Sequence, residues 1–401
     1  MDWSPGQQDA LDRVRGWLGD AREQQVFRLF GYAGSGKTTL AKHLAEGAGR
    51  VAFAAFTGKA ALVLRRKGCP ASTIHSLIYQ PKEKSAAHLK RLERELAALR
   101  EKPETPVADI AKLQDEVARE RQNLKRPSFN LKLDSELRAC DLLVLDEVSM
   151  VGAQIGGDLC SFGVPILALG DPAQLPPVMD GGFFTNKKPD VMLEEIHRQA
   201  ADSPIIKMAT IVRRGGALSA GMRFGDEAVV VAKSEVPFAT MVNFDQVLVG
   251  KNETRRCFND RYRREILGFT SELPVAGDKV VCLRNNSELG LLNGGLWSVE
   301  SSMDLGDEVA MELKDPDSGV SVAVNAHTAY FRGTEKDLPH GSWRDAEAFD
   351  FGYALTVHKF QGSEAPNILL VDESSCFQQN AYRWLYTGIT RASERLTVMK
   401  T

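Results

Sequence analysis

Short apolar runs recur along the first half of the chain, and their spacing predicts the strands of a buried sheet. Near-continuous runs lie at 26–30, 51–56, 142–145 and 166–169. Such runs are typical of strands covered on both faces of a parallel sheet, where the alternation of polar and apolar positions is lost. Helical signals lie between them, so the pattern predicts an α/β domain.

The second half of the chain returns to the α/β pattern after one interruption. Strands are predicted at 247–249 and 368–371, and an arginine-rich helix follows the first of them. Between them, short alternating strands with Gly and Asn turns indicate a small β-barrel. The expected domains are a first sheet domain over 1–81 and 127–203, a second over 204–273 and 346–401, and a barrel over 274–345 inserted in the second.

A charged segment without aromatic residues, 82–126, interrupts the first domain. Its apolar residues recur at three- and four-residue spacing in two stretches: Leu89, Leu92, Leu96 and Leu99, then Ile110, Leu113 and Val117. This spacing predicts two helices with one apolar face each. The sequence Pro-Glu-Thr-Pro at 103–106 separates them, so we expect an antiparallel helical hairpin inserted into the first domain.

The stretch 31–38, Gly-Tyr-Ala-Gly-Ser-Gly-Lys-Thr, fits the phosphate-loop pattern G-x-x-x-x-G-K-[ST]. It lies between the predicted strand 26–30 and a helix that ends near Gly47. Glycines let successive backbone N–H groups turn toward phosphate oxygens, Lys37 adds a full positive charge, and the Thr38 hydroxyl is a candidate Mg²⁺ ligand. The predicted nucleotide-binding residues of the loop are Gly34, Ser35, Gly36, Lys37, Thr38 and Thr39.

Polar residues follow two other buried strands, at the edge where open α/β sheets bind their ligands. Asp146 and Glu147 end the strand at 142–145. Asp146 is a candidate Mg²⁺ ligand, and Glu147 is a candidate base that orients the attacking water. Gln174 follows the strand at 166–169 and is a candidate contact of the γ-phosphate. The sequence thus predicts hydrolysis of a nucleoside triphosphate at this edge.

Composition indicates where the protein functions, but it does not identify the molecule that the protein binds. The 401 residues are 43% hydrophobic, and no apolar run approaches the length that spans a bilayer. The N-terminus lacks a signal-peptide pattern, so a cytoplasmic location is expected. Six cysteines without C-x-x-C spacing argue against a disulfide framework and a structural zinc. With a net charge of −3, attraction to nucleic acid would have to come from a local channel.

Some small polar clusters have two interpretations at this point. Thr57 with Lys59, and Thr73 with His75, are residue types that contact phosphate backbones but also cap helices. Gln7 follows a capping serine and a proline, so it lies in the first turn of a helix. An amide there is either a reader of an adenine edge or an ordinary exposed side chain.

In their order along the chain, these segments resemble the motif set of superfamily 1 helicases, most closely the 5′-to-3′ branch that includes RecD and Dda-like enzymes. After the phosphate loop come TGKAA at 57–61, TIHSL at 73–77, DEVSM at 146–150, GDPAQLPPV at 170–178, HRQ at 197–199, VHKFQGSE at 357–364 and YTGITRA at 386–392. The resemblance covers nearly the whole chain except the charged segment. It implies two RecA-like parallel-sheet domains, ATP and Mg²⁺ as cofactors, and an SH3-like barrel in the second domain.

The resemblance also implies roles for single residues. Arg198 and Arg391 match the two arginines that close on the γ-phosphate across the interdomain cleft. Together with them, Lys37, Glu147 and Gln174 complete the implied catalytic set. Nucleotide contacts implied outside the loop are Gln7 and His197 at the adenine, Glu364 at the ribose, and Gly362 beside it. The implied DNA-binding residues are Thr57, Lys59, Thr73, His75, Asn252, Arg255, Thr356 and His358.

The activity implied is ATP-driven movement along single-stranded DNA, with separation of forked duplex. Two alternatives stay open. One is a translocase, or a motor subunit of a larger recombination or nuclease complex, that does not unwind DNA. The other is a nucleic-acid-binding module whose nucleotide only switches affinity. We expect a monomer that binds single-stranded and forked duplex DNA through backbone contacts, and no membrane partner.

The charged segment departs from the family pattern, because better-known relatives carry a short β-hairpin wedge in this region. Its mixed charges suit a rigid arm better than a base-stacking platform. We hypothesise that its base, near 127–129, stands at the fork, and that its tip meets a replication or recombination protein. Phe129 is the aromatic residue there able to stack on a terminal base pair, although an aromatic beside a strand is commonly a core residue.

Overall fold

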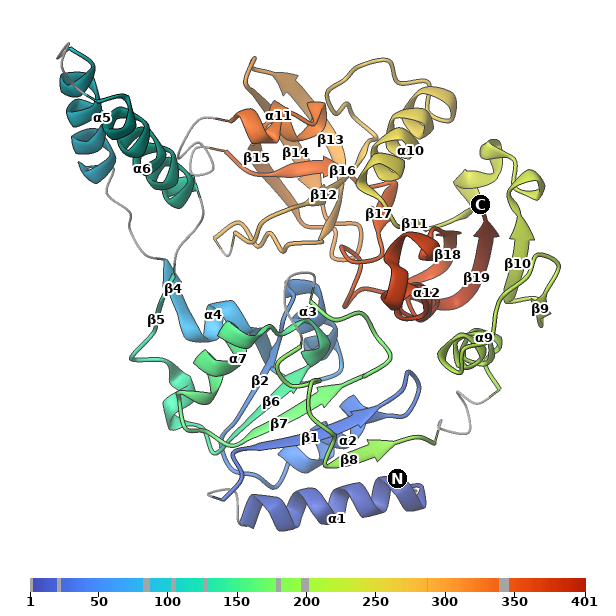
Figure 1. Ribbon diagram of the computed structural model, residues 1–401. Coiled ribbons are helices and arrows are strands. Elements are labelled where there is room, and N and C mark those ends of the chain that lie inside the picture. Colours follow the sequence, from blue (N-terminus) through green and yellow to red (C-terminus); the bar gives the residue numbers. More distant parts are fainter. Residues whose placement is uncertain are drawn as a thin grey trace.

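A computed structural model describes residues 3–19, 23–81, 87–101, 106–125, 129–177, 182–195, 202–286, 288–338 and 346–401. These residues form two mainly parallel six-stranded sheets, a five-stranded antiparallel sheet, a two-stranded ribbon and the helices around them (Figure 1).

The first sheet has the strand order β3-β2-β6-β7-β1-β8, and all of its strands run parallel. The strands are β1 (Val26–Gly31), β2 (Val51–Ala55), β3 (Ala71–Thr73), β6 (Leu142–Asp146), β7 (Ile166–Gly170) and β8 (Val191–Leu193). The four apolar runs are therefore strands, as predicted. Because β6, β7 and β1 are neighbours and parallel, the segments that follow them begin at the same edge. This edge brings the phosphate loop beside the acidic pair.

Helices cover both faces of the first sheet. Apolar residues of α1 (Pro5–Gly19), α2 (Lys37–Ala45) and α3 (Gly58–Arg66) share one core cluster with the sheet. The opposite face is covered by α4 (Ile74–Ile78) and α7 (Ala153–Cys160). The domain therefore has the three-layer α/β architecture that the alternating pattern predicts.

The second sheet has the order β17-β11-β18-β19-β10-β9, and only β9 pairs antiparallel to its neighbour. The strands are β9 (Arg223–Phe224), β10 (Ala228–Ala232), β11 (Gln246–Val249), β17 (Ala354–Thr356), β18 (Ala365–Asp372) and β19 (Ala392–Lys400). One face packs against α9 (Pro204–Arg213) and α12 (Ala381–Ile389). The other face packs against α10 (Asn252–Glu265).

An antiparallel sheet of order β15-β14-β13-β12-β16 lies between α10 and β17 in the chain. Its strands are β12 (Lys279–Cys282), β13 (Leu296–Asp304), β14 (Glu308–Lys314), β15 (Ser321–His327) and β16 (Phe349–Phe351), and α11 (Thr328–Arg332) follows β15. A bridge between Ala326 and Glu347 joins its two edges, so the sheet closes on itself. Its last strand lies beyond residue 345, where the sequence pattern ended the barrel.

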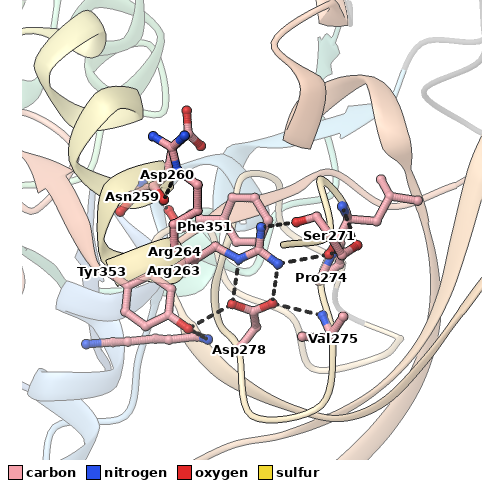
Figure 2. Close-up of polar contacts among 12 residues, drawn as sticks. Asn259, Asp260, Arg263, Arg264, Ser271, Pro274, Val275, Asp278, Phe351 and Tyr353 are labelled. Carbon is pink, nitrogen blue, oxygen red and sulfur yellow. Dashed lines mark hydrogen bonds and ion pairs between the residues drawn. The ribbon is translucent and has the colours of Figure 1, made fainter. Parts of the chain in front are cut away.

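A buried ion pair fastens this closed sheet to α10 of the second domain (Figure 2). Arg263 on α10 donates two hydrogen bonds of 2.9 Å to the carboxylate of Asp278, and the two side chains are only 4% and 0% exposed. The hydroxyl of Tyr353 donates to the same carboxylate, and the Lys279 backbone N–H donates to that hydroxyl. The Arg263 guanidinium also lies 4.0 Å from the centre of the Phe351 ring. The closed sheet and the second domain are therefore rigidly joined.

Replacing Asp278 with asparagine should destabilise the protein, because it leaves the Arg263 charge buried and uncompensated. Breaking a buried pair from one side costs about 3–5 kcal/mol. The expected result is a lower urea midpoint for unfolding. Glu265→Gln is the matched control, because Arg261 and Glu265 form a 2.9 Å pair on the same helix but both are exposed. Equal midpoints for the two variants would contradict the structural role of Asp278.

A two-helix arm projects from the first domain (Figure 1). Its base is a ribbon of β4 (Tyr79–Pro81) and β5 (Phe129–Leu131), which pair antiparallel. The arm itself consists of α5 (Ala87–Arg100) and α6 (Val107–Lys125). Leu89, Leu92 and Val117 are buried between the two helices, at positions of the leucine-rich spacing.

Two side-chain contacts connect the closed sheet to α3 of the first domain. Leu292, in the loop before β13, packs against Gly58. Arg66, the last residue of α3, forms an ion pair with Asp317 in the turn after β14, with 3.0 Å between Arg66 Nη2 and Asp317 Oδ2. Both of these side chains are exposed. Short 3₁₀ helices complete the described chain: η1 (Glu136–Ala139), η2 (Val148–Met150), η3 (Lys233–Glu235), η4 (Phe238–Asn243), η5 (Glu335–Asp337) and η7 (Ser374–Asn380). Among the described helices, none is long and apolar enough to cross a membrane.

Candidate active site

The phosphate loop leads from β1 into α2 through two residues with left-handed backbone angles, Gly34 (φ 80°) and Gly36 (φ 81°). Glycine has no Cβ to oppose these angles, and the loop can therefore turn its N–H groups inward. Lys37 is the first residue of α2, and its Nζ donates to the backbone oxygens of Gly31 at 2.6 Å and Tyr32 at 3.1 Å. The ammonium group thus lies against the loop itself.

The acidic pair lies directly beside the loop. Thr38 Oγ1 donates to Asp146 Oδ2 at 3.1 Å, and Asp146 Oδ1 accepts from the backbone N–H of Glu147 at 2.9 Å. Glu147 has a left-handed backbone (φ 53°), which is one of two such non-glycine residues in the described chain. Angles of this kind cost about 1–3 kcal/mol and are concentrated at functional sites. The geometry therefore gathers the two predicted Mg²⁺ ligands and the predicted base.

Burial raises the pKa of the Glu147 carboxyl above its ordinary value. The nearby charge of Arg391 opposes that shift, and the neighbouring carboxylate of Asp146 adds to it. A raised pKa makes this carboxylate a stronger proton acceptor than an exposed glutamate. Arg391 belongs to the second domain, so the acidic pair of the first domain lies within electrostatic range of a second-domain charge.

Gln7 is buried against the phosphate loop, with 4% of its surface exposed, so it is not an ordinary solvent-facing side chain. Its amide nitrogen donates to the backbone oxygen of Ser35 at 3.1 Å, and its amide oxygen accepts from the backbone N–H of Ser4 at 3.1 Å. Glycine is favoured at position 36 because its φ of 81° is rarely adopted by other residues, and a Cβ there would also lie 2.9 Å from that amide nitrogen. The Ser4 hydroxyl accepts from the Gln7 N–H, as expected for the capping serine.

Two buried polar atoms near the loop have no hydrogen-bond partner among the described residues: Ser35 Oγ and Gln174 Oε1. A buried polar atom without a partner costs free energy and commonly marks a binding site. A hydroxyl in a phosphate loop and an amide at the end of the neighbouring strand are suited to phosphate oxygens and to water. These two atoms fit the nucleotide site that the sequence predicts.

Arg391 comes from the second domain, between α12 and β19, and is 4% exposed. Its guanidinium donates to the backbone oxygens of Thr387 at 3.2 Å and Ser363 at 3.4 Å. The domains also touch where the Leu175 N–H donates to Thr387 Oγ1 at 3.0 Å. The end of α12 therefore lies against the loop that carries Gln174.

The remaining predicted nucleotide contacts are less closely gathered. Arg198 and His197 lie outside the described residues. Glu364 is exposed, whereas Gly362 lies against the first domain, because a Cβ there would be 2.9 Å from Thr57 Oγ1. Thr39 lies in the first turn of α2.

The predicted DNA-binding threonines of the first domain are helix caps in this structure. Thr57 Oγ1 accepts from the Ala60 N–H at the start of α3, and Thr73 Oγ1 accepts from the Ser76 N–H at the start of α4, each at 3.1 Å. Capping does not exclude a phosphate contact, because each helix start also presents further N–H groups. Burial lowers the pKa of Lys59, which lies 5.2 Å above the Phe360 ring of the second domain.

Two of the second-domain residues predicted to bind DNA, Arg255 and Asn252, contact other side chains of the protein. Arg255 is 9% exposed and pairs with Asp350 at 2.6 Å, while its Nε donates to Asn252 Oδ1 at 3.3 Å. The sequence predicts Arg255 as a DNA-binding residue, whereas in this structure its charge is neutralised by a buried carboxylate. Thr356 Oγ1 accepts from the Lys359 N–H, and His358 packs against a phenylalanine ring.

An aromatic group lies at the base of the arm. The ring centres of His75 and Phe56 are 5.9 Å apart, those of His75 and Tyr79 are 5.6 Å apart, and Phe129 lies 5.9–6.1 Å from the rings of Tyr79 and His75. Phe129 is nevertheless 45% exposed, so one part of its ring is open to solvent. It is neither a core residue nor an isolated surface residue.

Three residues form contacts at the phosphate loop that the sequence does not predict: Tyr32 within the loop, and Arg213 and Tyr386 of the second domain. Arg213 lies over the Tyr32 ring, and the Tyr386 hydroxyl contacts Ala33 and Asp171. Tyr32 lies within the phosphate-loop pattern and Tyr386 is the first residue of YTGITRA, whereas Arg213 belongs to no recognised motif. The contacts join residues that are far apart in the chain, so no local pattern predicts them.

Comparison with known proteins identifies the family. A family model described as an AAA domain matches residues 3–233, which is more than half of the chain, so the chain belongs to that family. A second model, the UvrD-like helicase C-terminal domain, matches residues 351–399. These matches confirm the resemblance to superfamily 1 helicases.

Two curated relatives match about two thirds of the chain. The ATP-dependent RecD2 DNA helicase of Deinococcus radiodurans is 28% identical over 284 residues, which are 64% of this chain and 36% of that protein. The RecBCD enzyme subunit RecD of Mycolicibacterium smegmatis is 25% identical over 290 residues, which are 65% of this chain and 50% of that protein. The matched region thus spans half or less of each relative's length.

The fold is similar to that of solved Pif1 helicases. The Pif1 helicase of Bacteroides, in complex with ADP-AlF3 and single-stranded DNA, has a TM-score of 0.54 and 17% identity, and the match covers 99% of this chain and 92% of that one. At this identity the similarity concerns the fold. It agrees with the parallel-sheet core described above.

Proposed function

We propose that this chain is an ATP-driven DNA helicase that moves 5′ to 3′ on single-stranded DNA and separates duplex. The observation that carries the proposal is the divided site, since the phosphate loop and Glu147 belong to the first domain whereas Arg391 belongs to the second. Hydrolysis at such a site depends on domain closure, which couples ATP turnover to movement. The names of the Deinococcus relative and of the Bacteroides structure favour DNA as the substrate.

The residues around the loop fit ATP with Mg²⁺. Thr38 and Asp146 would hold the ion, which when bound neutralises phosphate charge. The backbone N–H groups of the loop and Ser35 Oγ would contact phosphate oxygens. Gln7 would contact the adenine after its amide leaves the loop, and Glu364 the ribose.

The chain's own side chains would provide the chemistry by position and charge. Lys37 would exchange the loop carbonyls for phosphate oxygens, and Arg391 would reach the γ-phosphate on domain closure. We assign the same role to Arg198 and adenine stacking to His197, by family likeness. Glu147 would accept the proton of the attacking water, which the Gln174 amide would orient.

Replacing Glu147 with glutamine should slow ATP hydrolysis by about a hundredfold or more, while Mg²⁺-ATP still binds, because the loss is that of a positioned base. In the parent protein, the rate should fall as the pH drops through a value above the ordinary glutamate pKa of about 4.3, since a raised pKa means protonation at higher pH. Steady-state rates across pH, with nucleotide affinity measured separately, test both points. Collapse of nucleotide affinity would make Glu147 a structural residue instead.

DNA would cross both sheet domains beside the helix starts at Thr57 and Thr73, with Lys59, Thr356 and His358 close to the same path. Binding through backbone contacts is strongly salt-dependent and nearly indifferent to sequence. The polarity rests on family likeness. Unwinding should therefore require a 5′ single-stranded tail, and efficient unwinding of forks with only a 3′ tail would reverse the assignment.

The inserted parts of the chain have proposed roles as well. We propose that the closed sheet, with a boundary extended to residue 351, is an SH3-like module of the second domain. The ribbon and the α5–α6 hairpin would form a rigid arm at the fork, whose tip meets a replication or recombination protein. The half-exposed Phe129 at the base of this arm would stack on the terminal base pair.

Replacing Phe129 with alanine should lower unwinding of a forked duplex several-fold and leave DNA-stimulated ATPase unchanged, because stacking on a base is worth about 1–3 kcal/mol. Parallel ATPase and strand-separation assays measure the two rates. Leu133→Ala is the control, since Leu133 is also apolar and is 76% exposed just beyond β5. Equal unwinding by both variants would exclude Phe129 from strand separation.

One pair of assays separates the proposal from its alternatives. A helicase hydrolyses ATP faster with single-stranded DNA and unwinds a 5′-tailed fork. A translocase or motor subunit shows the first activity alone, an alternative that the named RecBCD subunit among the relatives supports. A nucleotide-switched binding module shows neither. Absence of any DNA-stimulated ATPase would contradict the proposed function.

A further inference from the structure

Two side chains of the second domain contact the phosphate loop at residues outside the proposed catalytic set. The hydroxyl of Tyr386, on α12, accepts from the backbone N–H of Ala33 at 3.1 Å and donates to Asp171 Oδ2 at 2.7 Å. The guanidinium of Arg213, at the end of α9, lies 3.4 Å from the centre of the Tyr32 ring. Both contacts cross from the second domain to consecutive residues of the loop.

The contact of Tyr386 is enclosed. Tyr386 and Asp171 are each 2% exposed, and Tyr32 and Ala33 pack against the apolar core that α9 and α12 form with the second sheet. Burial and the Asp171 carboxylate raise the pKa of the Tyr386 hydroxyl, and it therefore keeps the proton that it donates. A buried hydrogen bond of this kind is not exchanged for water without a rearrangement of the domains.

The contacts hold the start of the loop, beside the groups that a phosphate would need. A phosphate loop binds its ligand through backbone N–H groups and the lysine ammonium. Here the Ala33 N–H donates to Tyr386, and Lys37 Nζ donates to the backbone oxygen of Tyr32, whose ring Arg213 covers. A triphosphate that takes the ammonium must displace the Tyr32 carbonyl, and Ala33, which directly precedes the predicted phosphate-binding residues, is held by Tyr386.

We propose that Tyr386 and Arg213 are positioning residues that hold the phosphate loop against the second domain and thereby lower its affinity for nucleoside triphosphate. This inference rests on the proposed function, because it concerns the same nucleotide site. Tyr386 opposes binding by holding Ala33, and with it the start of the predicted phosphate-binding segment at Gly34, against the second domain. Arg213 opposes it by fixing Tyr32, whose carbonyl retains Lys37. Entry of the triphosphate then coincides with release of the loop from α9 and α12.

Titration of the full chain with a fluorescent, non-hydrolysable ATP analogue in the presence of Mg²⁺ tests the inference. Tyr386→Phe removes the hydroxyl and keeps the ring, and should tighten binding about two- to tenfold, the range of one net hydrogen bond. Tyr32→Leu removes the ring under Arg213 and keeps apolar contact, and should tighten binding about two- to fivefold, the range of an exposed cation–π contact. The KM for ATP should fall in the same order.

Two control substitutions accompany these variants, one on the same helix as Tyr386 and one that keeps the positive charge at position 213. Tyr382→Phe is the matched substitution on α12, because Tyr382 is 41% exposed, and it should leave affinity unchanged. Arg213→Lys keeps a cation over the ring and should tighten binding less than Tyr32→Leu. Loss of a purely structural contact does not tighten a ligand, so the direction of the change is diagnostic.

Unchanged or weaker analogue binding by both Tyr386→Phe and Tyr32→Leu, with ATPase present in the parent chain, overturns this inference and leaves the proposed function standing. If the parent chain neither binds the analogue nor hydrolyses ATP, both fall together. Should Tyr386→Phe fail to fold, Tyr32→Leu decides alone, since Tyr32 is only partly buried.

Discussion

Replacing Lys37 with alanine is expected to abolish ATP hydrolysis, with a loss of at least about a hundredfold, while single-stranded DNA still binds. The lysine supplies the charge that neutralises phosphate in the transition state, and the proposed DNA path does not include it. Steady-state ATPase with single-stranded DNA and DNA binding by fluorescence anisotropy measure the two properties. Unchanged turnover would remove the phosphate loop from the reaction.

A control for that variant lies on the same helix. Lys42 also belongs to α2, and its Nζ donates to the backbone oxygen of Lys67 at 3.0 Å, away from the loop. Lys42→Ala should hydrolyse ATP at the parental rate. The pair of variants therefore separates the position of the charge from its mere presence on α2.

Replacing Arg391 with alanine is expected to lower ATP turnover by up to about a thousandfold, the lower range for arginine fingers. This loss would come from a residue of the other domain, whose charge reaches Glu147 when the domains are together. Arg391→Lys should recover little, because a lysine lacks the planar fork that holds the Thr387 and Ser363 carbonyls. Single-turnover hydrolysis measures the chemical step directly.

Arg395→Ala is the control for Arg391, since Arg395 lies exposed on β19, the strand that begins directly after Arg391. It should hydrolyse ATP normally. A parental rate in Arg391→Ala would exclude catalysis across the cleft and would leave the first domain as a complete ATPase on its own.

The parts of the fold that the sequence predicted are those set by local patterns. The runs at 26–30 and 142–145 are strands because continuous apolar residues suit a sheet covered on both faces. The loop at 31–38 was recognisable because its glycines and lysine act through the backbone of one short segment. Lys37, Thr38, Asp146 and Glu147 then meet because the strands before them are parallel neighbours.

The features that the sequence did not predict depend on contacts between distant residues. Arg255 lies on a helix rich in polar residues, so the local sequence suggests an exposed side chain. It is buried because it pairs with Asp350, which lies far along the chain. The stacking of Arg213 on Tyr32 likewise joins two separate domains. Strands β4 and β5 have three residues each, which is too short for an alternating pattern to be visible.

The barrel boundary was missed for a related reason. Strand β16 has the sequence Phe-Asp-Phe, and β17 begins only after Gly352 and Tyr353. Most residues of both strands are apolar and only two residues separate the strands, so the sequence pattern shows one continuous stretch. Pairing with β12 assigns the first strand to the closed sheet, whereas pairing with β11 assigns the second to the α/β domain.

The closed sheet is attached to the second domain by the two-residue connection of Gly352 and Tyr353 and by the Arg263–Asp278 pair. It can therefore act as a lever, that is, as a rigid part that turns about this attachment. Any rotation of the second sheet carries the closed sheet with it, and the displacement grows with distance from the joint. The contact between Asp317 and Arg66 lies on this lever, and an exposed pair of that kind is worth at most about 1 kcal/mol. In the proposed ATP cycle, the closed sheet would therefore lose this ion pair at little cost in free energy, and separation from α3 would depend mainly on the packing of Leu292 against Gly58.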